Sequence, residues 1–199
     1  MAGARSVFLS HGFSAATTDM IQQAAGVSKA TVYSHYPTKE ALFIAVIEAE
    51  CDRFIASIRA LNVQSTRLRD VLMAVAQAYL ELVLSSAGLA LFRVVVADAP
   101  RFPELARKFY LAGPNALHEI VAEHLEEAAE RGEMDLVALG RDVAASQFVN
   151  LVRGELQLQC LMHPGSVPSA AQRDLWARAA VTTFVRAYGK RAGRSSAKG

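Results

Sequence analysis

Cysteine and net charge are both scarce in this 199-residue chain. The two cysteines, Cys51 and Cys160, lie far apart and outside any secretory context. We therefore expect reduced, buried thiols in preference to a disulfide, with a redox switch as the alternative. The formal net charge of +2 is too small to demand a polyanionic partner. Any nucleic-acid surface must come from local placement of donors.

Targeting and membrane signals are also lacking. The N-terminal stretch MAGARSVFLSHGF has no basic segment followed by a long apolar run, so neither a signal peptide nor a membrane anchor is expected. The longest uncharged run, residues 156–172, contains HPGSVPS, whose prolines and glycine would break a spanning helix. A cytoplasmic location is predicted.

The chain has no Walker loop, no GxGxxG and no nucleophile elbow. The segment HEIVAEH (118–124) has two histidines six positions apart, about 240° around a helix, so one metal cannot be held from the same face. We expect no enzyme, no metal and no cofactor, and an all-α enzyme without these motifs is the disfavoured alternative.

Hydrophobic residues make up 52% of the chain and recur at helical spacing almost throughout. This pattern predicts an all-α fold, including long helices over 38–60, 66–85, 139–162 and 168–189. Residues 104–133 predict a helix kinked near Gly113 and Pro114 and capped by Gly132. The segment LALFRVVVADAP (89–100) suits a strand or a buried helix, and its context favours helix.

The last two predicted helices carry apolar or small residues on two opposite faces, so each must be covered twice. We predict a homodimer whose interface is a four-helix bundle with two helices from each chain, a third internal helix being the alternative. The predicted interface residues are Gln147, Asn150, Gly154, Trp176, Ala179, Ala180, Thr183 and Ala187.

Residues 17–36 have the spacing of a helix-turn-helix. Thr17 is expected to cap a short helix that ends at Ala25, and Gly26 supplies the turn. Ser28 then caps a second short helix that runs through His35. The side chains expected where the two helices cross are Ile21, Ala25, Val27 and Val32.

With Val32 facing inward, the outward face of the second helix is short and polar, as a helix in a major groove requires. A methyl group of Ala30 or Thr31 suits thymine, and Lys29 and Ser34 can reach base edges. Thr38 is expected to cap the next helix, so that free backbone N–H groups and the Lys39 ammonium converge on a phosphate site. Thr17 and Thr18 are expected to form a similar phosphate site at the start of the first helix of the motif.

The stretch TTDMIQQAAGVSKATVYSHYPTKEALF resembles the DNA-binding domain of the TetR/AcrR family of transcriptional regulators nearly position for position. FRVVVADAPRFPELARKFYLAGP and EHLEEAAERGE resemble the AefR-like ligand-binding domain of that family. The resemblance implies nine helices, a homodimer built from the last two, and an apolar effector pocket. One departure is a shorter first helix with no basic arm before it.

The resemblance implies that bases are contacted by Lys29, Ala30, Thr31 and Tyr33. It implies that phosphates are contacted by Thr17, Thr18, Ser28, His35, Tyr36 and Lys39. Candidate pocket residues on the middle helices are Phe92, Arg93, Phe109, Tyr110, His118 and Phe148, with plain core packing as the alternative for each. Arg93 has three possible roles: it snorkels, pairs with Asp98 or Glu155, or meets an anionic ligand.

Three regions are expected: a helix-turn-helix DNA-binding domain (1–45), a ligand-binding and dimerisation domain (46–190) and a disordered basic tail (191–199). The expected function is a ligand-responsive DNA-binding regulator, a repressor released from a palindromic double-stranded operator by a small hydrophobic effector. The alternative is a small-molecule-binding dimer of the same fold without operator recognition. The sequence identifies neither the effector nor the operator.

Overall fold

The computed structural model describes the whole chain except residues 62, 64, 66, 164 and 191–199, so the predicted basic tail lies outside the described residues. The described residues form ten α-helices and one π-helical turn, and their only β-pairing is an isolated bridge between Met134 and Gly189. The all-α prediction is confirmed, and the 89–100 segment is helical as its context favoured.

The described chain falls into two compact units. Unit 1 comprises Met1–Ser57 and Ser85–Ala116, and unit 2 comprises Ile58–Leu84 and the described residues from Leu117 onward. The predicted domain boundary between residues 45 and 46 does not coincide with a boundary between these two units, and it stays a prediction.

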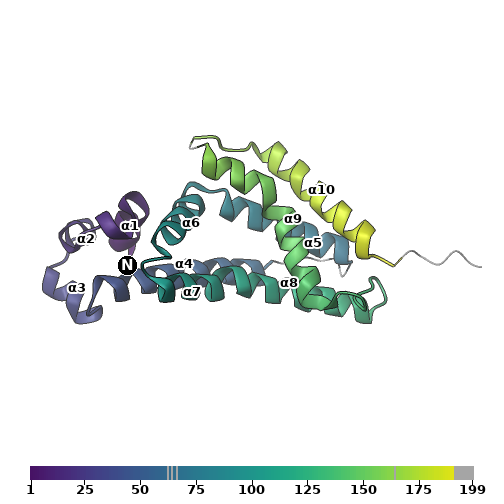
Figure 1. The fold of residues 1–199 in the computed structure, drawn as a ribbon, viewed down its shortest axis with the longest axis horizontal. Helices are drawn as coiled ribbons and strands as arrows, with labels where there is room; N and C mark the ends of the chain where they lie inside the picture. Colours follow the sequence, from purple (N-terminus) through teal and green to yellow (C-terminus); the bar gives the residue numbers. More distant parts are fainter. Residues whose placement is uncertain (62, 64, 66, 164, 191–199) are drawn as a thin grey trace, which may run out of the picture. The chain divides into compact units, whose positions relative to one another are not determined.

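Unit 1 holds the N-terminal helices and the middle of the chain. Its elements are α1 (Ala2–Ala15), α2 (Thr18–Ala25), α3 (Lys29–His35), most of α4 (Lys39–Arg59), α6 (Ser86–Asp98), α7 (Pro103–Tyr110) and the π-turn η1 (Leu111–Asn115). In Figure 1 the purple helices α1 and α2 and the following α3 lie together at one end of this unit.

Aromatic rings form the centre of unit 1. The centroids of Phe8 and Phe43 are 4.6 Å apart, and those of Phe13 and Phe43 are 5.0 Å apart. Phe102, just before α7, meets the Phe13 ring edge-on at 4.5 Å. Because such pairs contribute about 0.5–1.5 kcal/mol each beyond their area burial, this cluster fixes α1 against α4 and against the turn between α6 and α7.

The predicted kink at Gly113 and Pro114 is the π-turn η1, which joins α7 to α8 (Ala116–Glu130). Counting α7, η1 and α8 as one kinked helix gives the nine helices that were expected. Cys51 Sγ packs 3.2 Å from the position that a Cβ on Gly113 would occupy, so a side chain there would press on the Cys51 sulfur. Burial, with Asp52 and Glu48 nearby, raises the pKa of Cys51 to about 12, and both cysteines are buried thiols as expected.

Unit 2 is built from α5 (Leu68–Val83), α8, α9 (Gly140–Met162) and α10 (Ala170–Tyr188). Phe148 of α9 meets Phe184 of α10 edge-on at 5.2 Å. α9 leaves helical geometry at Gly154, and the Trp176 indole N–H donates to the Val152 carbonyl oxygen at 3.0 Å. This bond fixes α10 to α9 just before the break.

Among the described residues, no single helix has the length and apolar character needed to span a membrane; α5 and α6 meet that criterion only when joined as a bent pair.

The N-terminus of α5 is stabilised by a residue distant in sequence. Its N-cap, Arg67, makes no side-chain capping bond, and the Leu68 N–H instead donates to Glu133 at 3.0 Å. The Arg131 Nε donates to the other oxygen of Glu133 at 2.7 Å. The bond from the Leu68 backbone, followed by that from Arg131, lowers the pKa of Glu133 below its ordinary value of 4.5.

We expect Glu133→Gln to lower the free energy of unfolding by roughly 1 kcal/mol at pH 7, because an amide oxygen accepts from the Leu68 N–H and from Arg131 more weakly than a carboxylate does. A lowered native pKa means that the ionised carboxylate stabilises the fold above the unfolded pKa and that this contribution is lost as pH falls through the native pKa. Denaturant unfolding from pH 7 to below the native pKa of Glu133 should therefore show the two proteins converging at the acid end. A difference that is constant with pH would contradict this role.

Candidate nucleic-acid interface

The first helix of the predicted motif begins and ends as expected. The Thr17 hydroxyl accepts from the Met20 N–H at 3.2 Å and caps α2. Gly26 adopts the left-handed conformation (φ 66°, ψ 29°), which favours glycine, and its N–H bonds back to the end of α2. The predictions that Thr17 starts this helix and that Gly26 forms the turn are confirmed.

The second helix, α3, runs from Lys29 to His35 with Ser28 as its cap, as predicted. The Ser28 hydroxyl accepts from the Thr31 N–H at 3.1 Å. None of the seven residues of α3 is fully buried. Val32 and Tyr36 pack partly buried against the unit 1 core, so the remaining faces of α3 meet solvent.

One packing prediction is corrected. Ile21 is buried and Val32 half-buried, but Ala25 is exposed and Val27 is 43% exposed. The left-handed Gly26 closes α2 through backbone bonds and places Val27 at the surface. Met20 packs partly buried against the core beside Ile21, so the crossing is filled without Ala25 or Val27.

The predicted base-reading side chains are exposed, and their polar groups bond within the motif. Lys29 Nζ lies 3.2 Å from Asp19 Oδ1, and the Tyr33 hydroxyl lies 3.0 Å from Thr18 Oγ1. Ser34 Oγ donates to the Thr31 carbonyl oxygen at 2.8 Å. Ala30 is exposed. The structure thus brings Lys29, Ala30, Thr31, Tyr33 and Ser34 onto one short helix.

The residues predicted to contact phosphate differ in burial and in the bonds that their side chains already make. Thr17 and Ser28 use their hydroxyls as caps, while His35 is exposed. The Tyr36 ring is half-buried, and its hydroxyl donates to the Met1 sulfur at 3.1 Å. Thr38 Oγ1 accepts from the Ala41 N–H at 3.0 Å and caps α4 as predicted. Contact of these side chains with phosphate stays a prediction.

Lys39 has a structural role that the sequence did not suggest. Its ammonium donates to the carbonyl oxygens of Phe13 at 3.0 Å and Ala16 at 2.9 Å, and it lies 4.5 Å from the Phe13 ring centroid. These carbonyls belong to the last turn of α1, which follows a break at Gly12, and to its C-cap, where backbone acceptors lack helical partners. A lysine unfavourably placed at the start of α4 is therefore well placed at the end of α1.

The predicted pocket residues divide between the two units. Phe92, Arg93, Phe109 and Tyr110 belong to unit 1, where the Tyr110 side chain is exposed and the other three are half-buried. His118 and Phe148 belong to unit 2; Phe148 is buried against Phe184, as plain core packing requires.

A polar group within unit 2 was not recognised in the sequence. Burial raises the pKa of Tyr79 on α5, and the Arg153 guanidinium of α9 opposes that rise. Burial and Arg153 lower the pKa of His118 on α8, so Arg153 acts on both side chains. Arg153 also donates to Asn150 Oδ1 at 3.0 Å. The one sequence signal for this group is the arginine at position 153 within the helix predicted over 139–162.

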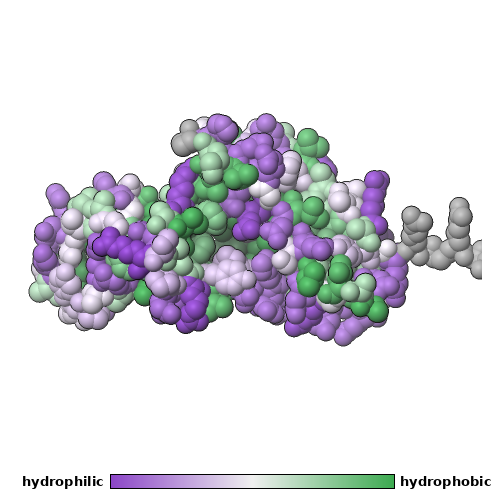
Figure 2. Space-filling model, viewed as in Figure 1, coloured by the Kyte–Doolittle hydropathy of each residue, from purple (hydrophilic) through white to green (hydrophobic). Residues whose placement is uncertain are grey.

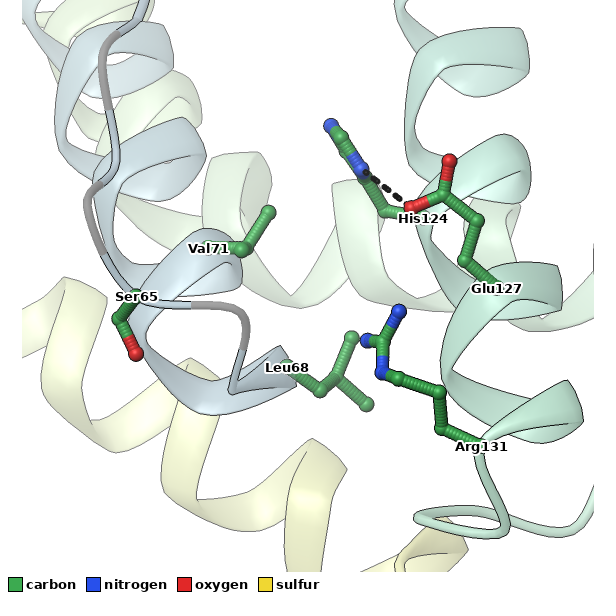
Figure 3. Close-up of a pocket in the computed structure, with 6 residues that line it drawn as sticks. All are labelled: Ser65, Leu68, Val71, His124, Glu127 and Arg131. Atoms are coloured by element: carbon green, nitrogen blue, oxygen red, sulfur yellow. Dashed lines mark ion pairs between the residues drawn. The ribbon is translucent and has the colours of Figure 1, made fainter.

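Unit 2 also contains a small pocket of about 170 Å³ between the start of α5 and the end of α8 (Figure 3). Leu68 and Val71 line one side, and His124, Glu127 and Arg131 line the other. His124 Nδ1 lies 3.7 Å from Glu127 Oε2. This mixture of charges beside an apolar wall was not anticipated from the sequence.

A capped pair of short helices whose second member is exposed and polar, followed by long amphipathic helices, defines a helix-turn-helix DNA-binding regulator. Residues 1–46 match the family model of bacterial regulatory proteins of the tetR family, and residues 70–190 match the model of the AefR-like transcriptional repressor C-terminal domain. The chain belongs to the TetR family of transcriptional regulators. Its fold and family are those of regulators rather than enzymes.

Two curated relatives match the chain in part. The transcriptional activator FasR of Mycolicibacterium smegmatis is 32% identical over 80 residues, which are 40% of this chain and 36% of FasR. The transcriptional repressor Rv1474c of Mycobacterium tuberculosis is 35% identical over 54 residues, 27% of this chain and 29% of that protein. The chain therefore spans only about a third of the length of these relatives.

Solved structures match nearly the whole chain. A TetR-family regulator from Mesorhizobium loti is 25% identical with a TM-score of 0.86, over 95% of this chain and 94% of that one. The flavonoid-responsive regulator FrrA is 37% identical with a TM-score of 0.77, over 96% of this chain and 95% of FrrA.

Lys39→Met should lower the stability of unit 1 by about 1–3 kcal/mol, because two backbone carbonyls lose a charged donor. Thermal unfolding checks this, with Lys108→Met on α7 as the control for removing a partly exposed cation that pairs with Glu48. Equal, small effects of both substitutions would show that the contacts at the end of α1 do not matter for stability.

Proposed function

We propose that the protein is a homodimeric repressor that binds an approximately palindromic operator through α3 of each protomer and is released by a small hydrophobic effector. The observation that carries the proposal is the exposed α3, which presents donors and small side chains in the pattern a major groove requires. Base contacts come from Lys29, Ala30, Thr31, Tyr33 and Ser34, and phosphate contacts from Thr17, Thr18, Ser28, His35, Tyr36 and Lys39. A cytoplasmic location is part of this proposal, because the protein must reach its operator.

Exposed apolar side chains on α9 and α10 support a dimer. Val143, Leu151, Leu158 and Met162 are exposed on α9, and Leu175 on α10 is 69% exposed. Figure 2 shows hydrophobic residues among hydrophilic ones on this face of the surface. Scattered exposed hydrophobics are ordinary, but four on α9 together with Leu175 on the adjacent α10 support an interaction surface there.

The predicted interface residues lie mostly on the same exposed faces. Those exposed are Gln147, Asn150, Gly154, Ala179, Thr183 and Ala187. Trp176 is half-buried and its indole bonds to the Val152 carbonyl, so it joins α10 to α9 within one protomer. Ala180 is buried within its own unit. Leu175 and Leu158 take their place as the large apolar residues of the proposed interface.

The proposed mechanism is a population shift. The unliganded dimer holds its two α3 helices near the spacing of successive major grooves, roughly 34–36 Å, and the effector favours a wider state. FrrA is described as flavonoid-responsive and is 37% identical, so flavonoids are the first effector class to test.

The function is tested by selecting bound duplexes from a random pool and from the DNA upstream of the gene, then adding flavonoids in a gel shift. We expect a palindromic consensus and dose-dependent release. Sequence-independent binding at low salt would instead favour a small-molecule-binding dimer without an operator. Operator binding that no flavonoid releases would remove this effector class, and an unchanged α3 separation with a releasing ligand would overturn the mechanism.

Charge placed on the exposed apolar faces should dissociate the dimer. Leu158→Glu and Leu175→Glu are expected to shift the protein toward monomer at micromolar concentration and to weaken operator binding, because each buries a carboxylate in the interface. Light scattering measures the mass. Val137→Glu is the control, since Val137 is 95% exposed on the α8–α9 connection. A dimer that persists in both α9 and α10 variants would place the interface elsewhere.

A further inference from the structure

Two neighbouring residues of α2 hold two residues of α3. Asp19 Oδ1 lies 3.2 Å from Lys29 Nζ, and Thr18 Oγ1 lies 3.0 Å from the Tyr33 hydroxyl. Asp19 also accepts from Gln22 Nε2 at 3.4 Å. The side chains of Asp19 and Lys29 are 69% and 52% exposed, so water screens their attraction and the pair contributes little to folding.

Asp19 is an anion on the surface proposed to meet a polyanion. Its position in the first turn of α2 suits the helix dipole. Thr17 and Thr18 in the same turn are proposed phosphate contacts, however, so an unpaired carboxylate there would oppose the approach of DNA. Lys29 balances that charge, and the pair presents no net charge to a phosphate backbone.

We propose that Asp19 limits non-specific DNA binding by neutralising Lys29, and thereby raises the selectivity of the helix-turn-helix. The inference rests on the proposed use of α3 in the major groove. On a duplex of arbitrary sequence, Lys29 would give up its contact with Asp19 and gain only a contact with phosphate. On the operator, a base-edge acceptor such as guanine O6 or N7 competes for the ammonium, and the exchange is favourable only where that base stands in reach.

The main experiment compares wild-type protein and Asp19→Asn, both full-length, on two duplexes of equal length. One is the sequence selected by the wild type and the other is the same sequence scrambled, each titrated from about 50 to 200 mM salt. Asp19→Asn should raise affinity for the scrambled duplex by roughly three- to tenfold at the low-salt end. Its plot of log affinity against log salt should steepen by about 0.9, the value for one added phosphate contact. Affinity for the selected duplex should rise less, so the selectivity ratio falls.

The matched control is Glu104→Gln on α7. Glu104 pairs with Arg107 at 3.2 Å, and both side chains are exposed, so the substitution makes the same change in net charge and also breaks an exposed pair. It should leave the salt slope unchanged. An equal effect of the two variants would reduce the role of Asp19 to net charge and overturn the proposal.

A double-substitution cycle with Lys29→Met tests whether Asp19 acts through Lys29. The change in slope caused by Asp19→Asn should be largely absent when Lys29 is already replaced. The same change in both backgrounds would mean that Asp19 repels phosphate directly. If Asp19→Asn lowers affinity for both duplexes, the ion pair favours DNA binding by orienting the Lys29 side chain. Either result overturns the proposal.

Failure of the proposed function gives a different result. If wild-type protein binds selected and scrambled duplexes equally, operator recognition is absent, and the scrambled-duplex titration still reports whether Asp19 limits binding. Because Asp19 is exposed, thermal unfolding of each variant should match that of the wild type.

Discussion

The contacts around Phe13 are the ones on which the recognition unit depends. Its ring packs against Phe43 of α4 and Phe102 before α7, and the Lys39 ammonium lies over it. The same ammonium binds the carbonyls of Phe13 and Ala16, where α1 ends. α2 begins at Thr18, two residues after Ala16. The contacts of Phe13 and Ala16 therefore set the direction in which α2 and α3 leave the core.

The helix-turn-helix projects from that support with few buried groups of its own. Ile21 is its buried anchor, and α3 has no fully buried residue. Bonds from α2 to Lys29 and Tyr33 therefore contribute to holding α3 in place. DNA must exchange these bonds for contacts of its own, so the same side chains order the free motif and read the operator in the proposed function. Exposed pairs suit both roles because they cost little to break.

Unit 2 is held by groups far apart in sequence. Glu133 completes the start of α5, and Trp176 binds the Val152 carbonyl before the break at Gly154. The backbone of Lys190 donates to the Glu133 carbonyl at 2.9 Å, which fastens the end of α10 beside the same turn. The Trp176–Val152 bond lies between α9 and α10 within one protomer. The exposed apolar residues of these helices are the ones proposed to contact the partner protomer.

The sequence alone determined the helical class, the helix-turn-helix and its caps, because these follow from local periodicity and from side chains that bond to backbone within a few residues. It also placed the kink at Gly113 and Pro114, where backbone chemistry is local. Only the tertiary structure decided the roles of Lys39, Glu133 and Trp176, since each bonds to backbone from another element and no sequence pattern links the partners. The prediction that Val27 packs between the two helices was wrong. Periodicity indicates which side of a helix a residue lies on, whereas its burial depends on the neighbouring side chains, and Met20 packs against the core here.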